Sequence, residues 1–275
     1  MNFNPITKEQ SLFFSSLSVL IFRLNIQGKG LIKIMTSRFL NLFFILIMSC
    51  LIAEENKSDD NDFIISGSLS ISNNGVAPVP SFTLGEPALI NSVSITKGRL
   101  TFTPETGLDF SGNPWFIENW FRWQIFDDRF KTNLGLDWSF FFQNYDVPDA
   151  NVHEVVRYLA LEIATGYDIS NNISAFGKYW YNEGIGERTD DGHFVDFTLN
   201  INNIQFSDSF LLHIYPEIFY FNFTGNIDGL SLANKIEISN SNFPVSLTAQ
   251  IIFPIWTNMP DLGTELSFGI VTPLN

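Results

Sequence analysis

Three histidines are the first side chains in this sequence that could do chemistry. His153 and His193 each stand near the start of a run of alternating residues, and His193 directly follows the acidic stretch 189–192. A carboxylate next to a histidine is an arrangement that general acid–base hydrolysis uses. Histidines and acids in a loop are also common as solvated residues, and the chain has no Gly-x-Ser-x-Gly nucleophile motif. We therefore predict no catalytic residue, and keep a hydrolase that uses His153 or His193 as an alternative.

The residue types that bind metals are sparse. Cys50 is the single cysteine and the three histidines are far apart in sequence, so a zinc site is not expected. Acids that fall in expected loops could bind Ca²⁺, but their spacing does not match a known calcium loop. These acids are Asp146, Asp149, Asp190 and Asp191. The sequence predicts no metal site and no cofactor.

A larger set of charged residues recurs at every second position, opposite large apolar residues. Successive side chains of a β-strand point to opposite faces, so this spacing predicts strands with one polar and one apolar face. Acids outnumber bases on the polar face, and such charges inside a membrane barrel mark either water or ion-paired filling. Arg122 and Asp137 lie on consecutive strands and are expected to pair. The predicted inner residues are Glu105, Asp109, Glu118, Arg122, Lys131, Asp137, Glu162, Lys178, Asp196, His213, Glu217, Lys235, Glu237 and Glu265.

The stretch Phe130–Phe142 shows the strand pattern most clearly. Large apolar residues alternate there with Lys131, Asn133, Asp137 and Ser139. About 13 residues is long for a strand of a soluble sheet, whereas a strand tilted across a bilayer needs roughly 9–11. The predicted lipid-facing residues on this and a later strand are Leu134, Leu136, Trp138, Phe140, Phe197 and Leu199. A charge at Trp138 is expected to block membrane assembly, and a charge at Ser139 to be tolerated.

Composition supports a membrane protein that crosses with strands. The chain is 45% hydrophobic with 29 Phe, yet only 16% of its residues are charged, against roughly 25% in soluble domains. Beyond residue 50 no apolar run reaches the roughly 20 residues that a membrane-spanning helix needs. Strands survive in lipid only as a closed barrel. We predict an all-β, antiparallel up-and-down barrel of about 12 strands over residues 63–275, with 10–14 possible.

The connections between these runs are expected to alternate in length. Short turns follow the even-numbered strands, as at Asp127-Asp128, and longer links follow the odd-numbered ones, as at Asn73–Ala88, Asn144–Val152 and Glu183–Gly192. Outer-membrane barrels have short periplasmic turns and longer outer loops. The alternation therefore places both ends of the barrel segment in the periplasm. Whether Asn73–Ala88, which is rich in proline, folds outward or into the barrel is left open.

The N-terminal part carries signals of export. Residues 1–34 show no clear pattern, and Met35 stands directly before a leader-like stretch, so we expect that 1–34 are an upstream misassigned start or are disordered. A basic residue, an apolar run and small residues predict a signal peptide over 35–53. Lipidation at Cys50 is the alternative to cleavage after Ala53. Residues 54–62 are then a flexible, acidic N-terminus.

The formal net charge of −14 argues against nucleic acid as a partner, since no basic patch is present to bind phosphates. An acidic interior would attract cations, although acidic loops that only keep the protein solvated are the simpler interpretation.

Three stretches resemble a known group of proteins. Pro80–Ala88 (PSFTLGEPA), Ser94–Glu105 (SITKGRLTFTPE) and Pro114–Trp123 (PWFIENWFRW) are similar to uncharacterised Bacteroidetes-type outer-membrane barrel proteins, and the resemblance extends loosely to the C-terminus. It implies a porin-like barrel and carries no known chemistry. Many such barrels end in an aromatic residue that the assembly machinery reads, whereas this chain ends in Pro-Leu-Asn; Phe268 is the candidate substitute.

The sequence thus predicts a protein of the bacterial cell outer membrane. A narrow, porin-like channel for small solutes with an acidic, cation-favouring lumen is the leading hypothesis. A closed structural or adhesive barrel and an outer-membrane lipase or protease are the alternatives. Expected partners are outer-membrane lipid, lipopolysaccharide and the barrel-assembly machinery.

Overall fold

The computed structural model describes residues 63–274, apart from 148–149, 187–188, 224–226 and 261. The side chains of residues 144–153 are also outside the description. The predicted misassigned start (1–34), signal peptide (35–53) and acidic N-terminus (54–62) lie outside the described residues.

The described residues form the twelve strands that the alternating runs predict. The strands are β1 (Ile64–Ser72), β2 (Ala88–Lys97), β3 (Leu100–Asp109), β4 (Pro114–Asp127), β5 (Phe130–Val147), β6 (Ala150–Ser170), β7 (Ile173–Gly184), β8 (Gly192–Gln205), β9 (Phe210–Phe223), β10 (Ile227–Asn240), β11 (Phe243–Thr257) and β12 (Glu265–Leu274). No helix among these residues is long and apolar enough to cross a membrane.

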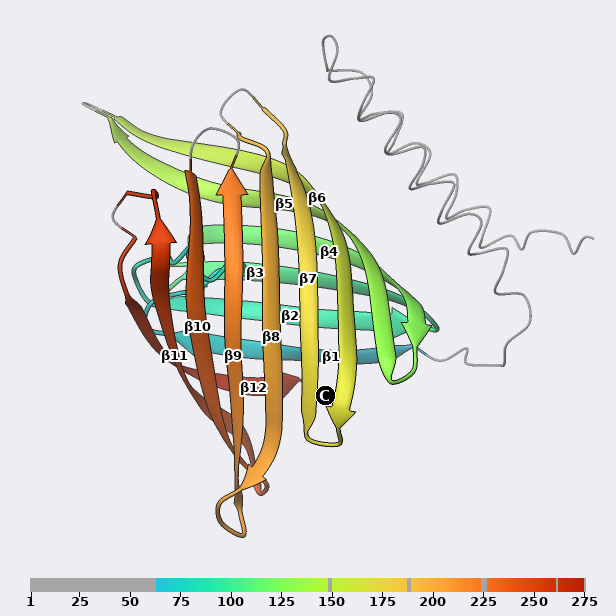
Figure 1. Ribbon diagram of the computed structural model, residues 1–275. Helices are drawn as coiled ribbons and strands as arrows, with labels where there is room; N and C mark the ends of the chain where they lie inside the picture. The colour runs from blue at the N-terminus through green and yellow to red at the C-terminus, as the bar shows by residue number, and fades with distance from the viewer. Residues whose placement is uncertain (1–62, 148–149, 187–188, 224–226, 261, 275) are drawn as a thin grey trace, which may run out of the picture. The chain divides into compact units, whose positions relative to one another are not determined.

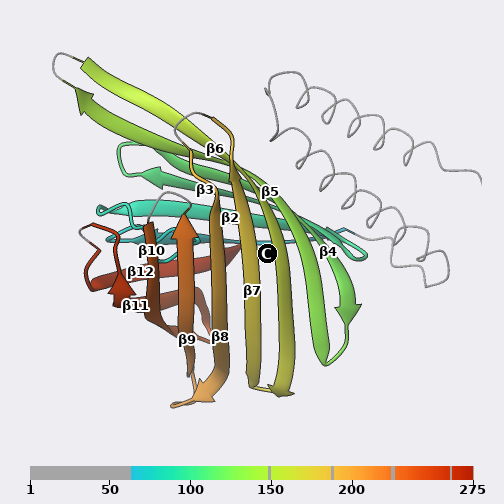
Figure 2. The same ribbon diagram turned by 45° about the horizontal axis from the view of Figure 1, so that its top comes forward.

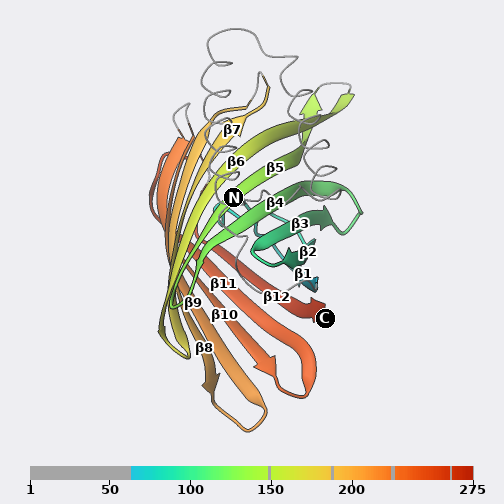
Figure 3. The same cartoon turned by 90° about the vertical axis from the view of Figure 1, so that its right-hand side faces the viewer.

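Each strand pairs antiparallel with the next, and β1 pairs with β12 to close the barrel. The closing register runs from Gly67 opposite Leu274 to Ser72 opposite Gly269. In Figure 1 the strands β7–β11 of the near wall cross the strands β1–β4 of the far wall, as tilted strands on opposite walls of a barrel do. Figure 2 shows the same two walls from a second direction, and Figure 3 shows β12 beside β11. The predicted closed antiparallel barrel is confirmed.

The two faces of the sheet differ in chemistry as the alternation predicts. On β8, Phe197 is 62% exposed on the outer face, whereas its neighbour Asp196 is 3% exposed on the inner face. Large apolar residues are exposed in the same way around the barrel, for example Phe121, Ile163, Leu232, Ile251, Phe253, Leu266 and Phe268.

The connections agree with the predicted alternation only in part. The turns after β2, β4, β6, β8 and β10 are short, and we call this the short-turn end. At the opposite, long-loop end, residues 73–87, 185–191 and 258–264 form long connections. The predicted loop Asn144–Val152 is wrong, because β5 continues to Val147 and β6 starts at Ala150. The backbones of these two strands pair along the whole stretch, from Val147 opposite Ala150 inward.

Candidate functional site

The enclosed face of the sheet carries several charged residues of the predicted set, whereas Asp109 lies at the exposed end of β3 beside Asn113. The register puts Glu105 opposite Glu118, Lys178 opposite Asp196, and Glu237 opposite His213. Glu118, Asp137, Glu162 and Asp196 are at most 5% exposed. These side chains therefore face the barrel interior, which is the candidate site.

Arg122 on β4 binds Glu162 on β6 rather than Asp137, the partner that the sequence predicted. Its Nε lies 2.7 Å from Glu162 Oε1 and its Nη2 lies 3.2 Å from Oε2. Gly135 on β5 stands between them, opposite both residues in register. Because glycine has no side chain, the guanidinium can cross β5 at this position. Asp137 stands opposite Trp120 and accepts a hydrogen bond from the backbone N of Asn119 at 2.6 Å.

A second ion pair lies on the next two strands. Lys178 Nζ on β7 is 2.7 Å from Asp196 Oδ2 on β8. The same ammonium lies 4.5 Å from the ring centre of Trp180 and 5.3 Å from that of Phe194. Because an aromatic face attracts a cation, both the two rings and the carboxylate fix the position of the Lys178 ammonium.

Two tryptophans join the two ion pairs. Trp120 Nε1 donates to Glu118 Oε2 at 2.8 Å, and Trp180 Nε1 donates to Glu162 Oε2 at 2.6 Å. The two indole rings are 5.0 Å apart, and Arg122 lies 4.3 Å over Trp120. The result is one continuous network of charges and rings across β4–β8. Sequence reasoning missed the inward tryptophans, although each stands two positions from a predicted inner charge on its own strand.

The remaining predicted bases have acid partners outside this network. Lys131 pairs with Asp168 at 2.8 Å, and Lys235 Nζ is 4.0 Å from Glu237. Each of the four predicted inner bases therefore has an acid partner. The acids of the predicted set that stand outside these pairs are Glu105, Asp109, Glu118, Asp137, Glu217 and Glu265; Asp109 accepts hydrogen bonds from Asn113, and Glu265 accepts one from Asn74.

An apolar cluster fills the interior next to the charged network. Phe194, Phe219, Phe221 and Ile252 are at most 1% exposed and belong to one packed group with the two tryptophans. Such packing leaves little free space at this level of the barrel.

The connection between β1 and β2, residues 73–87, folds into this cluster. Val76 and Val79 pack against it, and the Phe82 ring lies 5.8 Å from Phe221 and 5.5 Å from Phe223. We call residues 73–87 the inner segment. The question that the sequence left open is thereby settled for this structure, since the segment folds inward.

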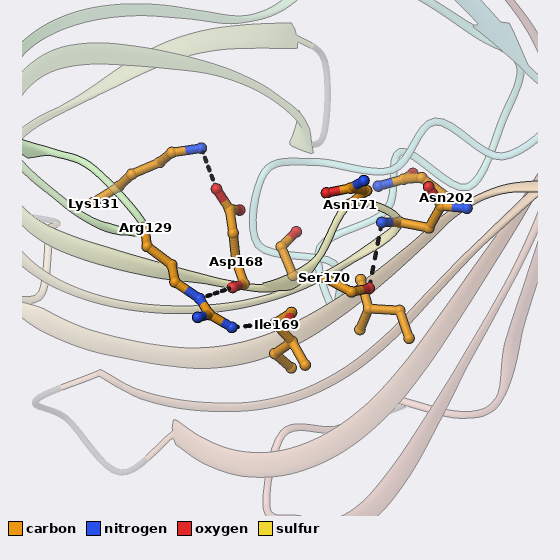
Figure 4. Close-up of a pocket in the computed structure, with 10 residues that line it drawn as sticks. Arg129, Lys131, Asp168, Ile169, Ser170, Asn171 and Asn202 are labelled. Atoms are coloured by element: carbon orange, nitrogen blue, oxygen red, sulfur yellow. Dashed lines mark hydrogen bonds and ion pairs between the residues drawn. The ribbon is translucent and has the colours of Figure 1, made fainter.

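The interior is hollow and polar at the short-turn end. A cavity of ≈ 540 Å³ is lined by the ends of β5–β8 and their turns, and Figure 4 shows its side chains. Lys131 and Asp168 form their ion pair there, while Arg129 donates to the carbonyl oxygens of Asp168 and Ile169 at 2.9 and 3.2 Å. Asn171, Asn172 and Asn202 add amide groups to the lining.

The two histidines whose side chains are described, His193 and His213, have hydroxyl and amide partners rather than the carboxylate that a hydrolase would need. His193 Nδ1 is 2.8 Å from the hydroxyl of Tyr179, and its ring lies between Tyr179 and Tyr181 on the outer face. The Asp191 carboxylate accepts from the backbone N of Gly184 at 3.0 Å. His213 contacts Asn202 and Ser239, at 3.2 and 3.1 Å, in a polar network near the short-turn end. The side chain of His153 lies outside the description. Among the described residues no group of three or more His, Cys, Asp and Glu could hold a metal ion.

The outer face decides what kind of barrel this is. So many exposed Phe, Ile and Leu side chains around one barrel would be unfavourable in water but are favourable in contact with lipid. The sheet also closes on itself and leaves no free edge, as a sheet that crosses a membrane must. The protein is an outer-membrane β-barrel.

Comparisons with known proteins find similar structures but no similar sequences. No protein-family model and no curated protein sequence matches the chain. The KdgM porin is similar at 8% identity and a TM-score of 0.49, over 76% of this chain and 99% of that chain. An outer membrane channel from Pseudomonas putida F1 is similar at 9% identity and a TM-score of 0.46, over 80% and 100%. OmpT, an outer membrane protein of Vibrio cholerae, gives 9% identity and 0.40, over 80% and 100%. The resemblance to Bacteroidetes-type barrels stays a prediction.

Proposed function

We propose that this outer-membrane barrel is a narrow channel for small solutes and favours cations. The observation that carries the proposal is the charge pattern of the interior. Arg122, Lys131, Lys178 and Lys235 are each neutralised by an acid, while further acids remain outside those pairs. A low-dielectric wall with a surplus of one sign raises the local concentration of the opposite ion.

The geometry also supports a channel that is narrow. The cavity of ≈ 540 Å³ at the short-turn end is lined by charged and amide side chains, as the entrance of a channel for polar solutes would need. Aromatic side chains and the inner segment fill the interior above it. Twelve strands lie between the filled interior of eight-stranded barrels and the aqueous pore of sixteen-stranded ones.

Single-channel recording of purified, folded protein in planar bilayers tests the proposal. We expect small conductance steps and, under a KCl gradient, a reversal potential that shows cation preference. Glu217→Gln removes an inner acid that stands opposite Ala233 and is expected to reduce this preference. The matched control is Asp208→Asn in the exposed turn between β8 and β9. Absence of conductance would contradict the channel, and anion preference would contradict the cation part.

A closed structural barrel is the second candidate, because the packed aromatic cluster is what such a barrel would need. A hydrolase is supported less, since His193 has a tyrosine hydroxyl rather than a carboxylate at Nδ1. His153→Ala and His193→Ala with assays of lipid and peptide hydrolysis test it.

Lipid and lipopolysaccharide remain the proposed partners of the outer face, and the barrel-assembly machinery remains the proposed partner of the strands during insertion.

A further inference from the structure

The inner segment is built as a unit that keeps its own hydrogen bonds. Ala77 N donates to Phe82 O, Phe82 N donates to Val79 O, and Leu84 N donates to Gly75 O, each at 2.9 Å. Val76 and Thr83 form a two-residue antiparallel bridge at its base. Pro78 and Pro80 restrict the backbone between them. Leaving the wall would break none of these bonds, so the segment can move as one body.

Its contacts with the barrel wall are of a different kind. Phe82, Val76 and Val79 pack against the aromatic cluster by apolar contact. Ser81 is 3% exposed, and its Oγ has no hydrogen-bond partner among the described residues. A buried hydroxyl without a partner disfavours the state that buries it. The inward position is thus held by apolar packing, which also buries Ala77 and Pro80, and is opposed by the Ser81 hydroxyl.

The two ends of the segment are suited to bending and to anchoring. Gly75 has φ +41° and Gly85 has φ +77°, a conformation that other residues rarely adopt. Asn73 anchors the first end to β12: its N donates to Phe268 O at 3.0 Å and its Oδ1 accepts from Phe268 N at 2.7 Å. Asn74 Nδ2 also donates to Glu265 Oε2 at 2.8 Å. These contacts fix the stem to the rim beyond the glycine, so that the part from Gly75 to Gly85 can swing while the stem stays in place.

We infer that residues 75–85 are the gate of the channel. In the closed state Phe82 sits on Phe221 and Phe223 of β9, and in the open state this ring leaves β9 while Asn73 stays bound to β12. The inference rests on the proposed channel function and adds its regulation: the pore opens and closes by docking of the protein's own segment against β9.

The motion is tested without recourse to conductance. A cysteine at Ser81 is labelled with a membrane-impermeant maleimide in reconstituted barrels, in a Cys50→Ser background. Combining Ser81→Cys with Phe82→Ala removes the docking ring and is expected to speed labelling at least about ten-fold. The matched control is Ser81→Cys with Phe141→Ala, since the Phe141 ring packs against Phe116 on β4 and Tyr158 on β6, both in the barrel wall. Equal labelling rates in the two variants would overturn the gate.

Conductance then separates the gate from the channel itself. Phe82→Ala is expected to raise the open probability several-fold, with Phe141→Ala close to the parent protein. An unchanged open probability in a conducting Phe82→Ala barrel would overturn the gate alone. If Phe82→Ala speeds labelling and no variant conducts, the segment moves but the proposed channel function is wrong.

Discussion

Two walls of the same barrel share an outer face and differ inside. Strands β4–β9, which we call the charged wall, turn ion pairs, tryptophans and phenylalanines inward. Strands β12, β1, β2 and β3, which we call the small-residue wall, turn mainly serine and threonine inward, as in the hydrogen bonds Ser94–Thr103 and Thr96–Thr101, both 3.0 Å. The small-residue wall also has the shorter strands, of 9 or 10 residues.

This difference explains where the inner segment lies. The segment leaves β1 on the small-residue wall, is anchored to β12, and places Phe82 against β9 of the opposite wall. Small inward side chains leave the volume that the segment occupies, and large aromatic ones provide the surface that it contacts. Contact with lipid requires an apolar outer face on every strand. The two walls therefore differ chemically only in the side chains of their inner faces.

Breaking an ion pair of the charged wall should have the largest effect. Arg122→Leu leaves Glu162, whose side chain is 2% exposed, without its cation. We expect a loss of about 3–5 kcal/mol in the free energy of unfolding, the usual result of removing one partner of a buried pair. Urea unfolding in detergent micelles measures it. The double variant Arg122→Leu/Glu162→Leu should recover most of the loss, and a double variant as unstable as the single one would contradict the pairing.

A charge on the outer face should act equally on both walls. Phe197→Lys on β8 and Leu69→Lys on β1 each place a charge on the outer face near the middle of the strand, where the Phe197 ring is 62% exposed. Each should cost about 2–4 kcal/mol if it lies near the bilayer midplane, and the same holds for Trp138→Lys. Folding yield into liposomes, read from the heat-dependent gel shift, measures it. Tolerance on one wall only would show that lipid does not surround the whole barrel.

A Cβ atom added at Gly135 tests whether the Arg122–Glu162 ion pair of the charged wall depends on the space beside β5. A Cβ there would meet Glu162 Cβ at 2.9 Å and Glu162 Oε1 at 3.0 Å. Gly135→Ala should therefore displace the carboxylate from Arg122 and cost roughly 1–3 kcal/mol, as overpacking does. Gly98→Ala is a poor control because its φ is +57°; Ser94→Ala on the small-residue wall is better matched, and should cost about 1 kcal/mol by losing one hydrogen bond. Equal stability of Gly135→Ala and the parent would mean that the ion pair does not need this gap.

The alternation of residues was sufficient to predict the barrel, because lipid outside and water or charge inside impose a period of two on every strand. The inner charges followed from the same period. Alternation does not predict which residue each charge pairs with. Arg122 reaches across β5 to Glu162 because position 135, which lies between them, is a glycine. Alternation also does not separate two aromatic faces, so Trp120 and Trp180 were missed beside Phe121 and Tyr179. The inward fold of residues 73–87 depends on contacts with β9, far away in sequence.

The smallest effect should come from a charge placed inside the small-residue wall. Ser68 points inward on β1, opposite Ser92 and Pro273, and Ser68→Asp should change stability by no more than about 0.5 kcal/mol, as substitutions away from packed features do. On the charged wall, the sequence predicts that a charge at Ser139 is tolerated, and the structure changes this expectation. Ser139 is 3% exposed and hydrogen-bonds Asp137, so Ser139→Asp would bury a second carboxylate beside the first. We expect Ser139→Asp to unfold in urea well before Ser68→Asp. Equal midpoints for the two variants would mean that both walls face the same water-filled space, and that the inward packing of the charged wall is looser than its contacts indicate.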